Sequence, residues 1–221
     1  GNLLADLTGH TAWVQFAGLS PDGKKIVTTS WDETAKIWDL LTGNLLVDLV
    51  GHTGSLNKAG FSPDSKKVFT ASSDNTCKIW DVNNGKLLVD LKGHKDIVSS
   101  ASFSPDGKKI VTASWDETAK IWDVTTGKLL FNLKKHGDDL TAVEFSPDGR
   151  IIVTVSRDKT AKIWDAGSGN LLLDLIGHLK SLSSISFSPD GNKIVTTSDD
   201  NTARVWNVNT GNLLVILTGH S

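Results

Sequence analysis

The 221-residue sequence predicts an all-β fold, a β-propeller built of four-stranded antiparallel blades, and three observations point to it. The segment SWDETAKIWD stands at 30–39 and again, letter for letter, at 114–123. Shifting the chain by 42 residues, half of that distance of 84, aligns related segments along its whole length. Each repeat also holds short runs rich in β-branched and aromatic residues, separated by turn motifs, which is the pattern of strands rather than helices.

The repeat divides the chain into five units and the start of a sixth. Every unit opens with G-[NK]-L-L, and a fixed period of this length is typical of repeat architectures. We expect one propeller domain over residues 1–221. Its units are 1–42, 43–84, 85–126, 127–168 and 169–210, followed by the partial unit 211–221.

Four strands are expected in each unit. In the first unit, KKIVTTS at 24–30 and TAKIWD at 34–39 form a hairpin, because the turn motif SPDG precedes them and WDE separates them. Two more strands are expected near 3–8 and 13–20. Proline presets φ in the SPDG turn and glycine accepts a positive φ; the second unit departs from this motif with Ser65. Apolar residues on both faces of the inner strands indicate a thin sheet packed between similar sheets, which is a propeller blade.

Composition narrows the class of partner. An apolar content of 38% allows a substantial core, and no window reaches the roughly 18 apolar residues of a membrane helix. A net charge of -2 without a basic block argues against nucleic acid and membrane partners. The single cysteine, Cys77, excludes an intrachain disulfide, and with no secretory segment in sight a cytoplasmic location is expected. The sequence contains no methionine, so Gly1 is not expected to be the first translated residue.

Several motifs recur together at one spacing. GH lies near the front of each unit, SPDG follows the next strand, S-x-D occupies the following turn and WD ends the unit. In this respect the whole chain resembles the WD-repeat β-propeller family, in particular its highly repetitive microbial members or an engineered repeat array. The resemblance implies the strand order d-a-b-c within a unit. The blades would then span about 12–50, 54–92, 96–134, 138–176 and 180–218, with strand 1–8 left over.

Each unit brings together a histidine, a serine, an aspartate and a tryptophan. A catalytic triad needs one nucleophile beside an oxyanion hole rather than five identical sets, so no enzyme is expected. One histidine per blade cannot converge on an ion, so neither a metal nor a cofactor is expected. The sets are His10, Ser30, Asp32 and Trp38; His52, Ser72, Asp74 and Trp80; His94, Ser114, Asp116 and Trp122; His136, Ser156, Asp158 and Trp164; His178, Ser198, Asp200 and Trp206.

A structural role for these sets follows from burial. A buried indole N–H needs an acceptor, and a serine–histidine–aspartate chain would carry that hydrogen bond to the turn. The resemblance implies that this network pins the d–a loop to the b–c turn. A sixth histidine, His220, belongs to the partial unit. Lys135 before His136, and Asn207 in place of the aspartate of WD, predict less regular fourth and fifth blades.

Three columns vary between units, and the resemblance places them on the top face around the mouth of the central channel, where partners bind. One interpretation is that they are loop positions free to drift. Three tryptophans in these columns favour a binding surface, since tryptophan and arginine dominate hot spots. An apolar arc of tryptophans would then face a charged arc. The candidate partner-binding residues are Trp13, Gln15, Trp31, Asn57, Ile97, Trp115, Asp139, Arg157 and Asp199.

Three functions are therefore weighed. The first is a non-catalytic protein–protein interaction scaffold or sensor module that binds a protein or peptide on its top face. The second is an engineered or recently amplified repeat array with no evolved ligand, useful as a model of propeller folding and assembly. The third is an enzyme or small-molecule binder that uses the channel.

Counting strands adds an expectation about assembly. Both 1–8 and 211–218 supply a d strand for one place. An open arc of five blades would expose two apolar faces, which soluble monomers rarely tolerate. We expect two copies to pair head to tail as a homodimer that closes the ring. Strand 1–8 would exchange with 211–218 or stay unpaired.

Overall fold

The structure is a computed structural model that describes residues 5–219. It confirms the all-β class, because these residues form 20 strands and no helix, in five four-stranded antiparallel sheets. The strands of every sheet neighbour one another in the order in which the chain makes them. Each sheet is therefore one blade, assembled from the last three strands of one repeat unit and the first strand of the next.

The blades are numbered from the N-terminal side. Blade 1 holds β1 (Val14–Leu19), β2 (Lys25–Ser30), β3 (Ala35–Asp39) and β4 (Leu45–Leu49). Blade 2 holds β5 (Leu56–Phe61), β6 (Lys67–Ser72), β7 (Thr76–Asp81) and β8 (Leu87–Lys92). Blade 3 holds β9 (Val98–Phe103), β10 (Lys109–Ser114), β11 (Thr118–Asp123) and β12 (Leu129–Lys134). Blade 4 holds β13 (Leu140–Phe145), β14 (Ile151–Ser156), β15 (Thr160–Asp165) and β16 (Leu171–Ile176). Blade 5 holds β17 (Leu182–Phe187), β18 (Lys193–Ser198), β19 (Ala203–Asn207) and β20 (Leu213–Leu217).

The SPDG turns close the β1–β2 type of hairpin. Gly23 has a φ of 67°, a left-handed conformation that glycine adopts without strain. Ser65, which replaces the glycine in the second unit, is held at a φ of 57°. The turn therefore keeps its shape even where the sequence departs from the motif.

The core is divided between the blades rather than gathered at one centre. At the junction of blades 1 and 2, Ile37 and Leu49 pack with Leu56 and Trp80. The same arrangement recurs at the junctions that follow, where the corresponding residues form further buried clusters. Each blade is thus stabilised mainly by packing against the blade or blades next to it, as in other repeat architectures.

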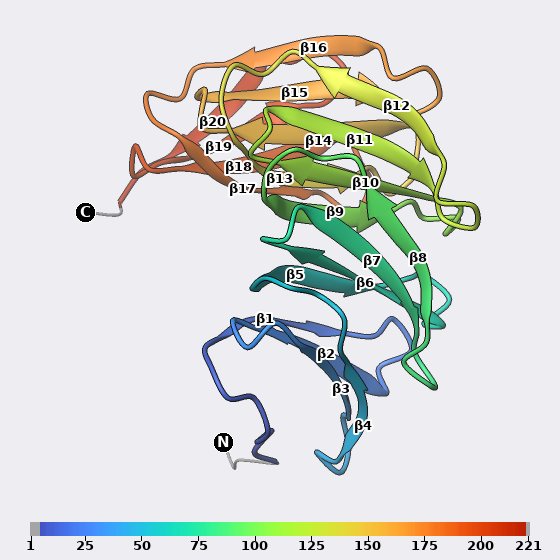
Figure 1. The fold of residues 1–221 in the computed structure, drawn as a ribbon. Helices are drawn as coiled ribbons and strands as arrows, with labels where there is room; N and C mark the ends of the chain where they lie inside the picture. The colour runs from blue at the N-terminus through green and yellow to red at the C-terminus, as the bar shows by residue number, and fades with distance from the viewer. Residues whose placement is uncertain (1–4, 220–221) are drawn as a thin grey trace.

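The five blades follow one another in an arc, with blade 1 at one end and blade 5 at the other (Figure 1). The inner strands touch in sequence: β1 contacts β5, β5 contacts β9, β9 contacts β13 and β13 contacts β17. Within residues 5–219, no contact of comparable extent joins blade 1 to blade 5. The arc is therefore open within this part of the chain.

The expected extra strand at 3–8 is only partly visible, since residues 1–4 lie outside the described residues. Residues 5–8 form no strand, which corrects that part of the expectation. They nevertheless lie against blade 1: a Cβ placed on Gly43 would meet the Ala5 Cβ at 2.6 Å, just as one on Gly85 would meet the Val47 Cγ1 at 2.6 Å. Residues 5–7 thus occupy the place of a preceding d strand without a strand partner.

Candidate interaction surface

The top edge of the arc consists of the loops that carry the histidines and the turns that carry the S-x-D motif. In blade 1 the Trp31 N–H donates to the Trp13 carbonyl oxygen at 2.9 Å. The same backbone bond joins Ser73 to Ser55, Trp115 to Ile97, Arg157 to Asp139 and Asp199 to Ser181. Two of the three variable columns therefore lie side by side in every blade.

A buried hydrogen-bond network fixes this edge. In blade 3 the Trp122 Nε1–H donates to the Thr112 Oγ1 at 2.9 Å, and the same oxygen lies 2.7 Å from the His94 Nε2. The His94 Nδ1 lies 2.8 Å from the Asp116 Oδ2, which also accepts the Lys95 N–H at 2.9 Å. All five blades contain this chain of bonds. The threonines are Thr28, Thr70, Thr112, Thr154 and Thr196.

The serine does not link tryptophan to histidine, which corrects the expected path. In blade 3, Ile110 pairs with Trp122 and Thr112 with Lys120 across the β10–β11 ladder. The indole can therefore reach Thr112, two residues along from Ile110, but not Ser114, four residues along. The Ser114 Oγ instead donates to the Asp96 carbonyl at 2.9 Å and accepts the Asp116 N–H at 3.0 Å. The threonine was missed, although all five units have threonine at this position.

The network shifts the pKa values of its members. Burial alone would raise the pKa of Asp116, but hydrogen bonds from His94, Thr118 and the Lys95 N–H outweigh it, so the pKa lies well below its ordinary value. Burial lowers the pKa of His94 despite its aspartate partner. The polarity that satisfies every atom is a neutral imidazole whose Nδ1–H donates to Asp116 and whose Nε2 accepts from the Thr112 hydroxyl.

This geometry leaves no atoms for a triad. Both histidine nitrogens are engaged, one by a carboxylate and one by a threonine, so neither faces the serine hydroxyl. A general base has to reach the nucleophile by a hydrogen bond. Among residues 5–219, no three histidine, cysteine, aspartate or glutamate side chains gather as metal ligands would. The recurring set therefore acts on structure.

Trp13 and Trp31 form an exposed aromatic pair on blade 1. Their rings stack with centroids 5.0 Å apart and planes inclined by 27°. Trp13 is 73% exposed and Trp31 is 49% exposed. Stacking holds both side chains in place, so a partner would find a rigid apolar platform.

Trp115, on blade 3, is not open in the same way. The Arg157 guanidinium of blade 4 lies 4.7 Å from the centroid of the Trp115 ring, and its Nη1 is 2.9 Å from the Asp139 Oδ2. The expected apolar arc opposite a charged arc is therefore corrected, because the arginine of one covers a tryptophan of the other. Ile97 and Asp139 are half-buried, whereas Asp199 is exposed.

The third variable column joins neighbouring blades. The Asn57 amide nitrogen donates to the Val98 carbonyl at 3.0 Å, the Ser99 hydroxyl to the Leu140 carbonyl at 2.6 Å, and the Thr141 hydroxyl to the Leu182 carbonyl at 2.7 Å. Asn57, a candidate for partner binding, is thereby occupied within the molecule. Gln15, in the same column, is exposed. The small polar residues at most positions of this column could have indicated from the sequence that the column is structural.

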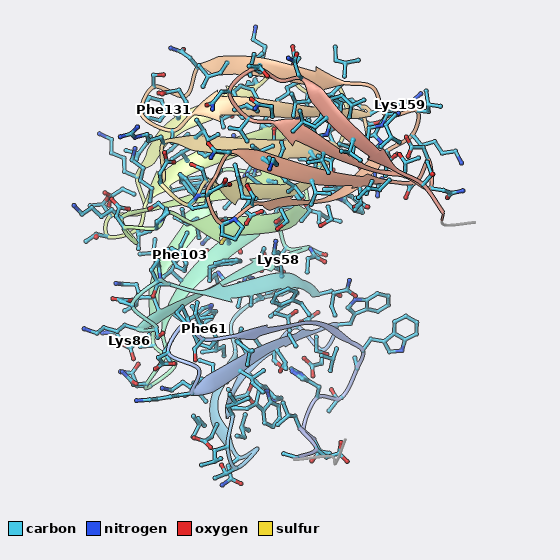
Figure 2. All side chains as sticks on the ribbon, turned by 180° about the vertical axis from the view of Figure 1, so that it is seen from behind. Lys58, Phe61, Lys86, Phe103, Phe131 and Lys159 are labelled. Atoms are coloured by element: carbon cyan, nitrogen blue, oxygen red, sulfur yellow. The ribbon has the colours of Figure 1, made fainter. Side chains whose placement is uncertain are left out.

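The inner strands line a hollow of about 640 Å³ that the Lys58 and Glu144 side chains enter. Lys58 lies on β5, the inner strand of blade 2, and Phe103 on β9, the inner strand of blade 3 that contacts it (Figure 2). Burial lowers the pKa of Lys58 and raises that of Glu144, and each charge partly offsets the shift of the other. The Lys58 Nζ donates to the Ser100 Oγ at 3.2 Å.

Blades 4 and 5 keep the regular network, which corrects the expectation that Lys135 and Asn207 disturb it. His136 has the same two partners as the other histidines, at 2.7 and 2.8 Å. The Asn207 Oδ1 accepts the N–H groups of Asn209 and Thr210 at 3.0 Å, as the Asp165 carboxylate does for its own turn. An amide oxygen therefore replaces the carboxylate in this role.

The fold and the repeated network define a WD-type propeller blade, and comparison with known families agrees. The protein-family model described as "WD domain, G-beta repeat" matches residues 1–39, 43–81, 85–123, 127–165 and 169–207. The chain belongs to the WD-repeat family. Propellers of this family generally mediate protein–protein interactions and are generally non-catalytic.

Similar curated proteins share one repeat with this chain. Nuclear distribution protein PAC1 of Arthroderma benhamiae is 48% identical over 40 residues, which is 18% of this chain and 9% of that protein. The B-type cell cycle switch protein ccs52A of Medicago truncatula is 51% identical over 37 residues, 17% of this chain and 8% of that protein. The matches thus span less than a tenth of these relatives. In the described part of the chain, no helix is long and apolar enough to cross a bilayer.

Proposed function

We propose that this chain is an interaction module that binds a protein or peptide on the top edge of blade 1, with Trp13 and Trp31 at the centre of the contact. The observation that carries the proposal is the stacked, exposed tryptophan pair. A surface that binds no partner usually carries polar residues at such positions. Truncation of a tryptophan at a binding hot spot costs about 2 kcal/mol or more of binding free energy. Trp115 contributes less, because Arg157 already covers it.

The experiment compares the chain with a Trp13→Ala, Trp31→Ala variant. Displayed peptide libraries are selected on the wild-type chain, and the affinity of each selected peptide is then measured for both. We expect the variant to lose at least about tenfold in affinity, which corresponds to about 1.4 kcal/mol. Leu41→Ser, at an exposed residue of the turn between β3 and β4, is the matched control and should bind as the wild type does.

Two outcomes count against the proposal. Selected peptides that bind both chains equally well would move the site away from the tryptophan pair. A library that yields no binder would favour the alternative, a repeat array of engineered or recent origin with no evolved ligand. The expected cytoplasmic location stays a prediction.

Self-association is the second part of the proposal, because blades 1 and 5 each present an apolar face to solvent. Val14 on blade 1 is 53% exposed and Leu217 on blade 5 is 49% exposed. Exposed apolar faces of this kind mark interaction surfaces. The mass of the chain in solution, measured by light scattering after size exclusion, tests this part.

A further inference from the structure

The junctions between blades have two different halves. At the junction of blades 4 and 5, blade 4 contributes Val153, Ile163 and Leu175 from one of its faces. Blade 5 contributes Ile194 and Trp206, which lie on the opposite face of a blade. Each blade therefore has a forward face, toward higher residue numbers, and a back face, toward lower ones. The junction of blades 1 and 2 pairs the same two kinds of face.

One forward face and one back face have no blade against them in the described part of the chain. The forward face of blade 5 consists of Val195, Val205 and Leu217, one repeat after the residues that blade 4 buries. Leu217 is 49% exposed, whereas Leu175 in the same place on blade 4 is 2% exposed. The back face of blade 1 includes Val14 and Leu40, both exposed, while Leu56 and Val82 in the same places on blade 2 are buried.

The back face of blade 1 is covered in part by residues 5–7 of its own chain, through Ala5 and Leu7 near Gly43. β20 carries Val215 and Leu217 at the corresponding positions and is already hydrogen-bonded to β19. Replacing residues 5–7 by β20 would exchange an alanine for a valine and an unpaired segment for a strand. More apolar surface would be buried and less conformational entropy lost, so both effects favour the exchange.

A polar group points the same way. At three junctions the side chain of Asn57, Ser99 or Thr141 donates to a carbonyl oxygen of the next blade. Ser183, in the same column of blade 5, instead pairs with the Thr197 Oγ1 at 2.8 Å. The acceptor that repeats this pattern is the carbonyl of Val14, the residue that corresponds to Val98, Leu140 and Leu182.

We propose that the forward face of blade 5 binds the back face of blade 1 in a second copy of this chain, with β20 taking the place of residues 5–7. The inference rests on the self-association proposed above and names its interface. The second copy is the occupant because the chain carries both halves of a junction that it already makes four times. The contact joins unlike surfaces, so it builds a ring where the rotation closes and an open chain of copies where it does not.

The test uses two glutamate substitutions with a matched control, and a third substitution in the competing segment. Val14→Glu places a carboxylate on the back face and Leu217→Glu places one on the forward face, and burial of an unpaired carboxylate is unfavourable. Ile216→Asp puts the same charge on β20, but on the side that corresponds to Asp174 and faces blade 4. Circular dichroism establishes that each variant is folded, and light scattering after size exclusion gives its mass.

We expect the wild type and the Ile216→Asp control to form dimers or longer assemblies at micromolar concentration. Each glutamate variant alone should associate at least about tenfold more weakly, because each has lost one half of the contact. A mixture of the two should form a one-to-one complex, since each variant retains the half that the other lacks. Leu7→Ser, which loosens the competing segment, should strengthen association of the otherwise unchanged chain.

The results separate the two proposals. A wild-type mass of 23.7 kDa would refute self-association itself, and with it this interface. Assemblies that persist in both glutamate variants, or a mixture that forms no complex, would show that the chain associates through a different surface. A Leu7→Ser variant that associates no better than the wild type would rule out the exchange of β20 for residues 5–7.

Discussion

Thr112 is the residue on which the buried network of blade 3 depends, and its replacement by valine tests the network directly. The side chain keeps its size, so little cavity is formed, but the hydroxyl is lost. The Trp122 indole N–H and the His94 Nε2, at 2.9 and 2.7 Å from this oxygen, both lose their partner. Trp122 is 2% exposed and Thr112 fully buried, so water cannot replace the hydroxyl.

The magnitude follows from these two groups. A buried polar group left without a partner costs about 1–3 kcal/mol, so Thr112→Val should lower the free energy of unfolding by about 2–6 kcal/mol. Urea denaturation followed by circular dichroism measures the change. Thr125→Val is the matched control, since Thr125 is exposed in the turn before β12, and it should change the free energy by no more than about 0.5 kcal/mol.

A double-mutant cycle sharpens the test. Trp122→Phe removes the donor that Thr112→Val leaves unpaired, so the double variant should cost less than the sum of the two single variants. Strict additivity would show that the two side chains do not interact. A denaturation midpoint for Thr112→Val that matches the wild type would refute the buried network altogether.

Two further predictions concern charge. In blade 5, Ile216 occupies the position of Asp48 in blade 1, which pairs with Lys36 at 2.8 Å, and the buried Arg204 Nε has no hydrogen-bond partner. Ile216→Asp should supply that partner and raise the free energy of unfolding, measured by urea denaturation, by about 0.5–1 kcal/mol. No change would show that the arginine is solvated instead. The lowered pKa of Asp116 means that below about pH 4 the unfolded chain binds a proton that the folded chain does not, so the free energy of unfolding should decrease as the pH falls. Asp116→Asn should make this decrease shallower by about one proton between pH 4 and pH 2, and parallel curves would contradict the assignment.

The sequence alone predicted the blades well, because their signals are local. The expected strands at 24–30 and 34–39 correspond to β2 and β3 within one residue, since the turn motifs mark where each begins. The path of the buried hydrogen bonds was less accessible. It depends on which residue of β10 lies diagonally opposite Trp122, and this cross-strand register places Thr112 rather than Ser114 within reach.

The candidate surface shows the same limit. Comparison of the repeat units identified Trp13 and Trp31, whose rings stack on each other within one blade. It did not separate them from Asn57, which bonds to Val98 of the next blade, nor from Trp115, which Arg157 covers. Contacts between blades depend on how successive sheets are set against each other, and a column of letters within one unit carries no such information.

In every blade, one backbone hydrogen bond joins the S-x-D turn to the loop that carries the histidine, so the top edge holds five pairs of linked residues. The distance between the bonded nitrogen and oxygen is 2.9 Å in all five blades, whatever the side chains, because main-chain atoms form the bond. On the proposed binding surface, two substitutions in one blade would therefore replace one such pair of side chains, and the backbone bonds of the neighbouring blades would stay in place. Along the arc the pairs run Trp–Trp, Ser–Ser, Ile–Trp, Asp–Arg and Ser–Asp, an ordered series that a partner lying across the blades would meet one after another.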